Sequence, residues 1–157
     1  MVAFRGIHHA GLVVDDLDAA IAFYGELLDM VEIERDSWSA PAAMEDQAVG
    51  LTGSSAEGVM MRGSNSYLEL WEYLAPQQVG DEPAERGAHE RGLRHLAIEV
   101  DDVPAALDRL VELGGSRMGD PVEISDDGAG AVYCRDPFGT IIEFMSIGGS
   151  MASLDDL

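Results

Sequence analysis

Alternating apolar and polar positions along the first half of the chain predict a β-α-β-β-β order of elements. Residues 7–14 alternate and are rich in strand-forming side chains, which indicates a strand. Asp15 or Asp16 then precedes apolar residues at helical spacing, so a capped helix is expected over 17–28. Further strands are expected at residues 31–35, 58–62 and 66–73, with a hairpin turn at 63–65 joining the last two. Residues 36–57 carry no clear pattern, and segments of this length often form a pocket wall.

The same order restarts after a polar stretch, residues 74–93, that is broken by proline and glycine. A strand is expected at 94–100, and a helix capped by Asp101 or Asp102 follows it and stops before Gly114. The remaining predicted strands lie at residues 122–125, 129–134 and 140–146.

The two halves also repeat one another residue by residue. His9 matches His95, 86 positions later, and the Asp-Asp and Ala-Ala pairs downstream match without a gap. Near its end each half has a glutamate between apolar residues, Glu69 in Tyr-Leu-Glu-Leu-Trp and Glu143 in Ile-Ile-Glu-Phe-Met. A repeat of this kind predicts two tandem modules of one design.

Strand alternation predicts that each of these four side chains points away from the apolar, helix-covered face of its own strand. His9 points away from the apolar residues Leu12 and Val14, and His95 and both glutamates follow the same rule in their own strands. A glutamate among apolar strand residues is costly to bury without a partner, and a cation would supply one. We therefore expect a divalent metal held by His9, Glu69, His95 and Glu143.

Composition narrows the range of partners. Thirty acidic residues face nine basic ones, all of them arginine, giving a net charge of −21. This balance disfavours nucleic acid and anionic membranes, and it leaves a small-molecule substrate as the expected partner of an acidic protein. The single cysteine, Cys134, cannot form an internal disulfide; with no signal peptide or apolar span evident, a cytoplasmic location is expected.

These motifs closely resemble the vicinal oxygen chelate superfamily, which contains glyoxalase I, bleomycin resistance proteins and extradiol dioxygenases. The resemblance covers about residues 7–146 and rests on His-His-Ala-Gly-Leu-Val-Val-Asp-Asp-Leu, His-Leu-Ala-Ile-Glu-Val-Asp-Asp-Val and Arg-Asp-Pro-Phe-Gly-Thr-Ile-Ile-Glu-Phe. It implies an α+β fold in which two βαβββ modules form a curved mixed sheet, a cup, around the metal, and the family's ligands fall on the same four residues. It also implies a homodimer.

The expected domain is a single one over residues 1–157. Its parts are module one at about 5–74, a linker at about 75–93, module two at about 94–147 and a tail at 148–157. Whether the modules pair within one chain or swap across a dimer stays open.

Two imidazoles and two carboxylates suit Zn, Ni, Co, Mn or Fe(II). Such a site favours a glyoxalase-I-like lyase or isomerase that abstracts a proton next to a carbonyl and forms a metal-stabilised enediolate. Glu143 is the expected base and Glu69 its counterpart, although the near-symmetry of the repeats allows the reverse. The alternatives are an extradiol-type Fe(II) dioxygenase, an epimerase of the methylmalonyl-CoA type, or a non-catalytic drug-binding or metabolite-binding resistance protein.

Several further side chains are expected near the site. The residues predicted to line a substrate pocket flank the glutamates on their own face or lie in the family's turn near the cup: Tyr67, Trp71, Phe138, Ile141 and Met145. His8 is expected on the helix-covered side, as a structural residue.

Overall fold

The computed structural model describes residues 2–79, 83–149 and 151–154, and these fall into two compact units, 1–79 and 80–157. The boundary lies in the polar stretch predicted as a linker. Each unit is a mixed α+β structure with its own sheet, so the predicted α+β class and the two-module design are confirmed. The joining of the two sheets into one cup, and the single domain over 1–157, stay predictions.

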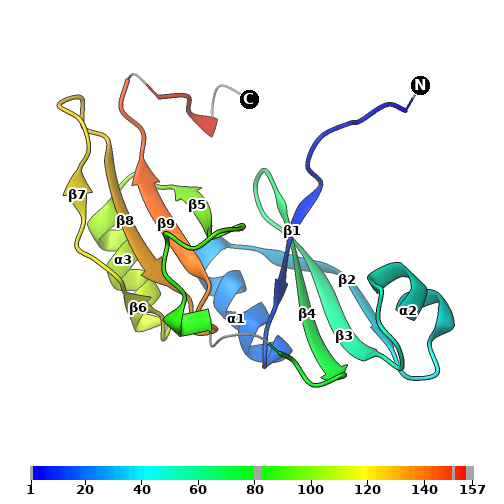
Figure 1. The fold of residues 1–157 in the computed structure, drawn as a ribbon. Helices are drawn as coiled ribbons and strands as arrows, with labels where there is room; N and C mark the ends of the chain where they lie inside the picture. The colour runs from blue at the N-terminus through cyan, green and yellow to red at the C-terminus, as the bar shows by residue number, and fades with distance from the viewer. Residues whose placement is uncertain (1, 80–82, 150, 155–157) are drawn as a thin grey trace. The chain divides into compact units, whose positions relative to one another are not determined.

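The first unit has four strands and two helices (Figure 1), in the order β1 (His9–Val13), α1 (Leu17–Leu28), β2 (Val31–Trp38), α2 (Ala43–Val49), β3 (Ser55–Arg62) and β4 (Tyr67–Ala75). The sheet order is β1-β4-β3-β2, with β1 parallel to β4 and the other pairs antiparallel. Helix α1 leads from β1 at one edge of the sheet to β2 at the other edge, and β4 then lies beside β1 as its parallel neighbour.

The second unit repeats this plan with short edge strands. Its elements are a 3-10 turn (Pro83–Glu85), β5 (His95–Glu99), α3 (Val103–Glu112), β6 (Ser116–Arg117), β7 (Val122–Glu123), β8 (Gly130–Arg135) and β9 (Ile141–Ser146). The sheet order is β5-β9-β8-β6, and β7 also pairs with β8. Again the first strand is parallel to the last, so the two units share one topology.

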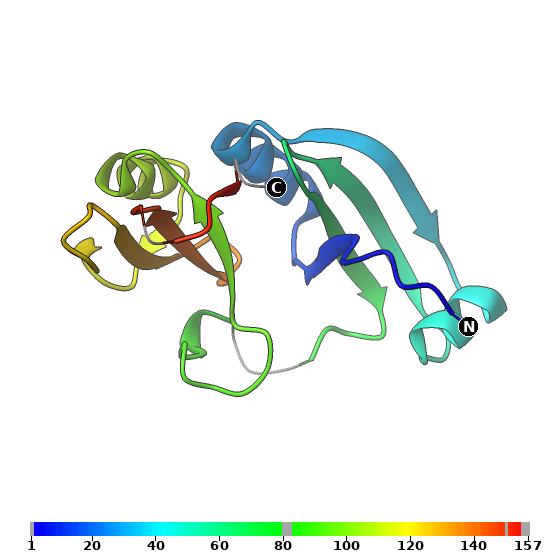
Figure 2. The ribbon, with the colours of Figure 1, turned by 90° about the horizontal axis from the view of Figure 1, so that it is seen from above.

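One helix covers one face of each sheet. In the first unit α1 buries Leu17, Ala20, Phe23 and Tyr24 against β3 and β4, whose Leu68 and Leu70 are also buried (Figure 2). In the second unit α3 buries Val103, Leu107 and Leu110 against β8 and β9, with Ile142 and Phe144 beneath it. The opposite face of each sheet is therefore the face that carries the odd-numbered residues of β4 and β9.

Cys134 belongs to this core. It is fully buried on the helix side of β8, and its thiol donates to the Ile142 carbonyl oxygen at 3.3 Å. Burial raises the pKa of the Cys134 thiol to about 12, and the negative charge of Asp136 adds to the rise. The cysteine is thus a buried core residue, as its apolar surroundings in the sequence suggest.

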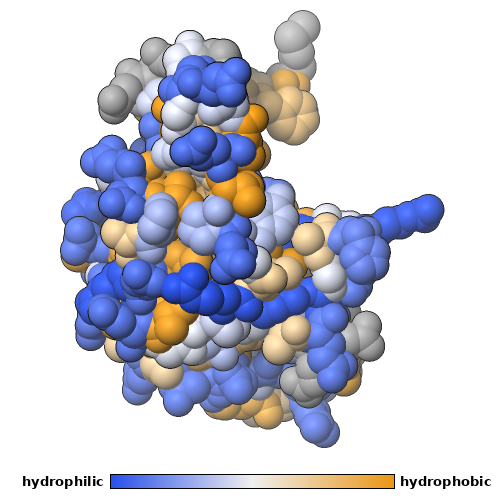
Figure 3. Space-filling view, turned by 90° about the vertical axis from the view of Figure 1, so that its left-hand side faces the viewer, coloured by the Kyte–Doolittle hydropathy of each residue, from blue (hydrophilic) through white to orange (hydrophobic). Residues whose placement is uncertain are grey.

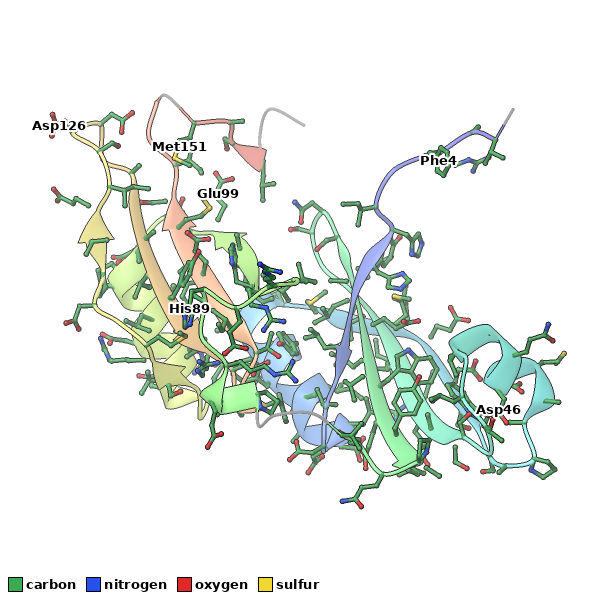
Figure 4. The ribbon with its side chains drawn as sticks, viewed as in Figure 1. Phe4, Asp46, His89, Glu99, Asp126 and Met151 are labelled. Atoms are coloured by element: carbon green, nitrogen blue, oxygen red, sulfur yellow. The ribbon has the colours of Figure 1, made fainter. Side chains whose placement is uncertain are left out.

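Several local expectations need correction. The unassigned segment 36–57 contains the end of β2 and the helix α2, and β6 was not predicted because two residues give no pattern. The strand expected at 122–125 pairs only over Val122–Glu123. In the tail, the Ser153 hydroxyl and the Leu154 N–H both donate to the carboxylate of Glu99, which Figure 4 labels.

The surface agrees with the composition. In the space-filling view hydrophilic residues predominate, with apolar groups between them (Figure 3). Within the part of the chain that the structure describes, no helix is both long and apolar enough to cross a membrane.

The two Asp-Asp pairs of the repeat give a matched test of helix capping. Asp16 and Asp102 accept from the N–H groups of Ala19 and Ala105 at 2.9 Å, whereas the exposed Asp15 and Asp101 do not cap a helix. We expect Asp16→Ala and Asp102→Ala each to lower the free energy of unfolding by about 1 kcal/mol. Urea unfolding followed by circular dichroism measures this. Equal losses in Asp15→Ala and Asp101→Ala would contradict the capping assignment.

Candidate metal centre and substrate face

Each unit brings one histidine and one glutamate of the predicted quartet together. His9 Nε2 lies 3.3 Å from Glu69 Oε2 in the first unit, and His95 Nε2 lies 3.1 Å from Glu143 Oε2 in the second. The four side chains are partly exposed, between 18% and 35%. Among the described residues no group of three or more His, Cys, Asp and Glu side chains can hold a metal, so each unit presents a pair.

The repeat of the pairs follows from strand register. Glu69 on β4 lies beside Gly11 on β1, and Glu143 on β9 lies beside Ala97 on β5. Each histidine precedes that small neighbour by two residues, so it lies on the same face of the sheet as the glutamate. The small neighbour leaves the imidazole a clear diagonal approach to the carboxylate. This shared geometry is why the two units give nearly the same distance.

The donor atoms fit a divalent metal. With ligand bonds of about 2.0–2.2 Å, two neighbouring ligands of one ion lie about 3.0 Å apart at right angles and about 3.4 Å apart in a tetrahedron. Both observed separations lie in that range. Two imidazole nitrogens and two carboxylate oxygens suit the borderline divalent ions Zn, Ni, Co, Mn and Fe(II).

His8 is part of this face, contrary to the sequence expectation. Its ring is exposed, stacks on Tyr67 with centroids 5.1 Å apart, and places its Nδ1 2.9 Å from Nδ1 of His9. The residue lies just before β1 begins, so strand alternation does not govern its direction. A hydrogen bond at the far nitrogen is what orients a metal-binding histidine, and His8 makes that bond to His9.

The second unit supports its pair differently, through Tyr133. This residue lies opposite Glu143 in the β8–β9 ladder, and its ring lies 5.0 Å from that of His95. Burial raises the pKa of the Tyr133 hydroxyl, and the charge of Glu143 and the hydrogen bond between the two side chains raise it further. The hydroxyl thus keeps its proton beside the carboxylate and is available to donate to it. Sequence reasoning missed Tyr133, although counting back from the turn at 136–140 finds it.

The predicted pocket residues have mixed environments. Tyr67 and Trp71 are half-buried on the Glu69 face, and Met145 is half-buried on the Glu143 face. Ile141 also points to the Glu143 face, but it is only 3% exposed, so it is a buried residue beneath that face and not part of its open surface. Phe138 lies in the turn between β8 and β9. The Asp136 carboxylate stabilises this turn by accepting hydrogen bonds from the backbone N–H groups of Phe138 and Thr140. Their contact with a substrate stays a prediction.

An aromatic cluster extends the Glu69 face beyond the predicted residues. Trp38 at the end of β2 packs on Trp71 and Tyr73, with centroids 4.8 and 6.0 Å away. Its indole N–H donates to the buried Ser54 hydroxyl at 2.8 Å, and Ser54 in turn bonds to Asp46 on α2 (Figure 4). The hydrogen bonds that the Asp46 carboxylate accepts from the Ser54 hydroxyl and from the N–H groups of Ser54 and Gly53 hold the pKa of Asp46 below its usual range. The segment that sequence analysis could not assign thus fixes one wall of the face.

Gly58 makes room for that wall. A Cβ at this position would lie 2.2 Å from Cε3 of Trp71, so the ring lies directly across the backbone of β3. Gly11 is different, since a Cβ there would lie 3.7 Å from Glu69 Oε2, an ordinary contact.

These two glycines allow a paired test. We expect Gly58→Ala to displace Trp71, to lower the free energy of unfolding by about 1–3 kcal/mol, and to change the tryptophan emission. Gly11→Ala, which copies Ala97 of the other unit, should stay within about 0.5 kcal/mol. Urea titration followed by fluorescence reads both, because the protein's two tryptophans are Trp38 and Trp71. Equal effects of the two substitutions would contradict the packing described.

Comparisons with known proteins agree with this arrangement. The model of the glyoxalase/bleomycin resistance protein/dioxygenase superfamily matches residues 6–144. A 2-epi-5-epi-valiolone epimerase from Actinomyces sp. is 31% identical over 153 residues, covering 90% of this chain and 79% of that protein. A glyoxalase family protein from Bacillus cereus has a similar structure, with a TM-score of 0.83, 22% identity and coverage of 94% and 97%. The fosfomycin resistance protein FosX from Listeria monocytogenes, whose structure holds Mn(II) and sulfate, gives a TM-score of 0.54 at 18% identity, covering 98% of each chain.

Proposed function

Since the chain belongs to the glyoxalase/bleomycin resistance protein/dioxygenase superfamily, we propose that it is a divalent-metal-dependent isomerase that moves a proton at a carbon next to a carbonyl group. The observation that carries the proposal is the matched His–Glu pair in each unit, at 3.3 and 3.1 Å. Two such pairs supply the four ligands His9, Glu69, His95 and Glu143. The metal centre then requires both units, taken from one chain or from two chains of a homodimer.

Four protein ligands favour proton transfer over oxygen chemistry. An octahedral ion with four such ligands keeps two positions for neighbouring oxygens of a substrate, whereas oxygen-activating iron sites usually keep three open. The intact pairs also argue against a resistance protein that only binds its ligand. A dioxygenase and a binding protein are therefore the weaker candidates.

The name of the relative that is 31% identical, 2-epi-5-epi-valiolone epimerase, favours epimerisation over a lyase reaction. That protein is named an epimerase of a ketone, and inversion of a centre beside a carbonyl needs only the removal and return of one proton. A methylmalonyl-CoA type of epimerase is less favoured, because it needs a further glutamate upstream of Glu69. Glu57 is paired with Glu72, whose carboxylate accepts from the Leu17 N–H of α1, so Glu57 belongs to the helix-covered face.

The proposed reaction balances without an oxidant or reductant. The C–H bond breaks, its proton passes to a carboxylate, and its electron pair moves onto the carbonyl oxygen. A divalent ion in the site would act as a Lewis acid toward that oxygen and stabilise the charge that develops. Glu143 is the proposed base, and Glu69 offers a carboxylate for the return of the proton to the other face of the carbon. Trp71 and Tyr67 flank Glu69, where they offer an apolar wall to the substrate.

Solvent exchange tests the proposal directly. Protein reconstituted separately with Zn, Ni, Co, Mn and Fe(II) would be incubated in D₂O with 2-epi-5-epi-valiolone, and in parallel with the hemithioacetal of methylglyoxal and glutathione. We expect deuterium at the carbon next to the carbonyl in at least one of these probes, detected by NMR. Glu143→Gln should reduce the exchange at least a hundredfold.

Glu72→Gln is the matched control, since it removes a carboxylate from the same strand as Glu69 but on the helix side. It should exchange within about twofold of the wild type. Absence of exchange from both probes with all five metals would contradict the proposed function.

A further inference from the structure

The two His–Glu pairs are not chemically equivalent, and the difference lies at one strand position. The residue opposite the glutamate in the neighbouring hairpin strand is Met60 for Glu69 and Tyr133 for Glu143. A thioether cannot donate a hydrogen bond, whereas a phenol can. Glu143 therefore has two polar neighbours, His95 at 3.1 Å and Tyr133 directly opposite it in the β8–β9 ladder. Among the described residues, the polar partner of the Glu69 carboxylate in its own unit is His9.

We propose that Tyr133 is a positioning residue that orients the Glu143 carboxylate for proton transfer, an inference that rests on the proposed function. A carboxylate that would both hold a metal and act as a base needs a second anchor that keeps one oxygen aimed at the substrate. The Tyr133 hydroxyl, opposite Glu143, would supply that anchor. Met60, which lies opposite Glu69, cannot play this part. The difference makes Glu143 the preferred base of the two glutamates.

The surroundings of Tyr133 suit this role. The ring is half-buried and packs at a tilt of 38° on His95, so one side chain contacts both members of the pair. Its position is set by the β8–β9 hairpin, which places Tyr133 directly opposite Glu143. The base of that hairpin is also fixed, because the buried Arg135 donates to the carbonyl oxygens of Pro83, Arg86 and Gly139. The hydroxyl is therefore carried by a rigid element rather than by a free loop.

The test is the Tyr133→Phe variant, which removes the hydroxyl and keeps the ring against His95. With 2-epi-5-epi-valiolone in D₂O, or the hemithioacetal where that is the active probe, we expect the kcat of exchange to fall about 10- to 100-fold while KM stays within about threefold. The Co(II) form gives a readout that does not depend on turnover. Its absorption spectrum should shift in Tyr133→Phe, because the carboxylate of Glu143 reorients, while about one Co(II) still binds per chain.

Cys134→Ala is the control for loosening of the strand. It removes a fully buried side chain from the other face of β8, so it should lower Tm and leave kcat and the Co(II) spectrum unchanged. A Tyr133→Phe protein with wild-type kcat and an unshifted spectrum would overturn the positioning role. A wild-type protein with the Tyr133-dependent Co(II) spectrum but no exchange on either probe would instead overturn the proposed function and leave the Tyr133–Glu143 pairing intact.

Discussion

A carboxylate on the central strand of each sheet is the constraint around which this protein is organised. Glu69 lies on β4, between β1 and β3, and Glu143 lies on β9, between β5 and β8. Apolar neighbours on the same strands remove much of the water that would otherwise solvate them, so each carboxylate needs a partner within the sheet. In both units the partner is a histidine from the parallel edge strand. The edge-strand residue that lies beside each glutamate is small, Gly11 or Ala97. The helix of each unit packs on the opposite face of the sheet.

A pair of ligands is half of a metal site. Protein sites for borderline divalent metals usually use three or four protein ligands, and each unit supplies two. The proposed centre takes one such pair from each of the two units of the repeat. The copies then differ around a common plan. The first unit supports its histidine through His8 and adds an aromatic wall at Trp38, whereas the second supports its glutamate through Tyr133. A repeated scaffold with unequal surroundings suits a reaction in which two carboxylates have different tasks.

Much of this arrangement could be predicted from the sequence because it depends on periodicity. The helix over 17–28 was predicted with its observed bounds, since its cap and its apolar spacing are both local signals. The faces of His9, Glu69, His95 and Glu143 followed from strand alternation, and in each unit the histidine lies close to the glutamate. Their convergence on one metal stays a prediction. What escaped prediction depends on contacts across strands or on irregular backbone. His8 lies just before β1 and stacks on Tyr67 of β4, a contact that strand alternation cannot predict. Helix α2 buries no side chain and has no side-chain cap, so no pattern in the sequence marks it. Predicting that Tyr133 and Met60 lie opposite the two glutamates requires the register of each hairpin. That register can be obtained only by counting residues outward from each turn.

The most direct measurement is the metal content of the purified chain, by elemental analysis after reconstitution with Zn, Ni, Co, Mn or Fe(II). About one divalent ion per chain is expected, whether the two pairs meet within one chain or across a dimer. His9→Ala and His95→Ala, which alter different units, should each reduce it at least tenfold, while His89→Ala in an exposed loop should not. Loss of metal in both ligand variants would establish that one centre draws on both units. Retention of metal in both, or no metal in the wild-type protein after reconstitution, would contradict the shared site.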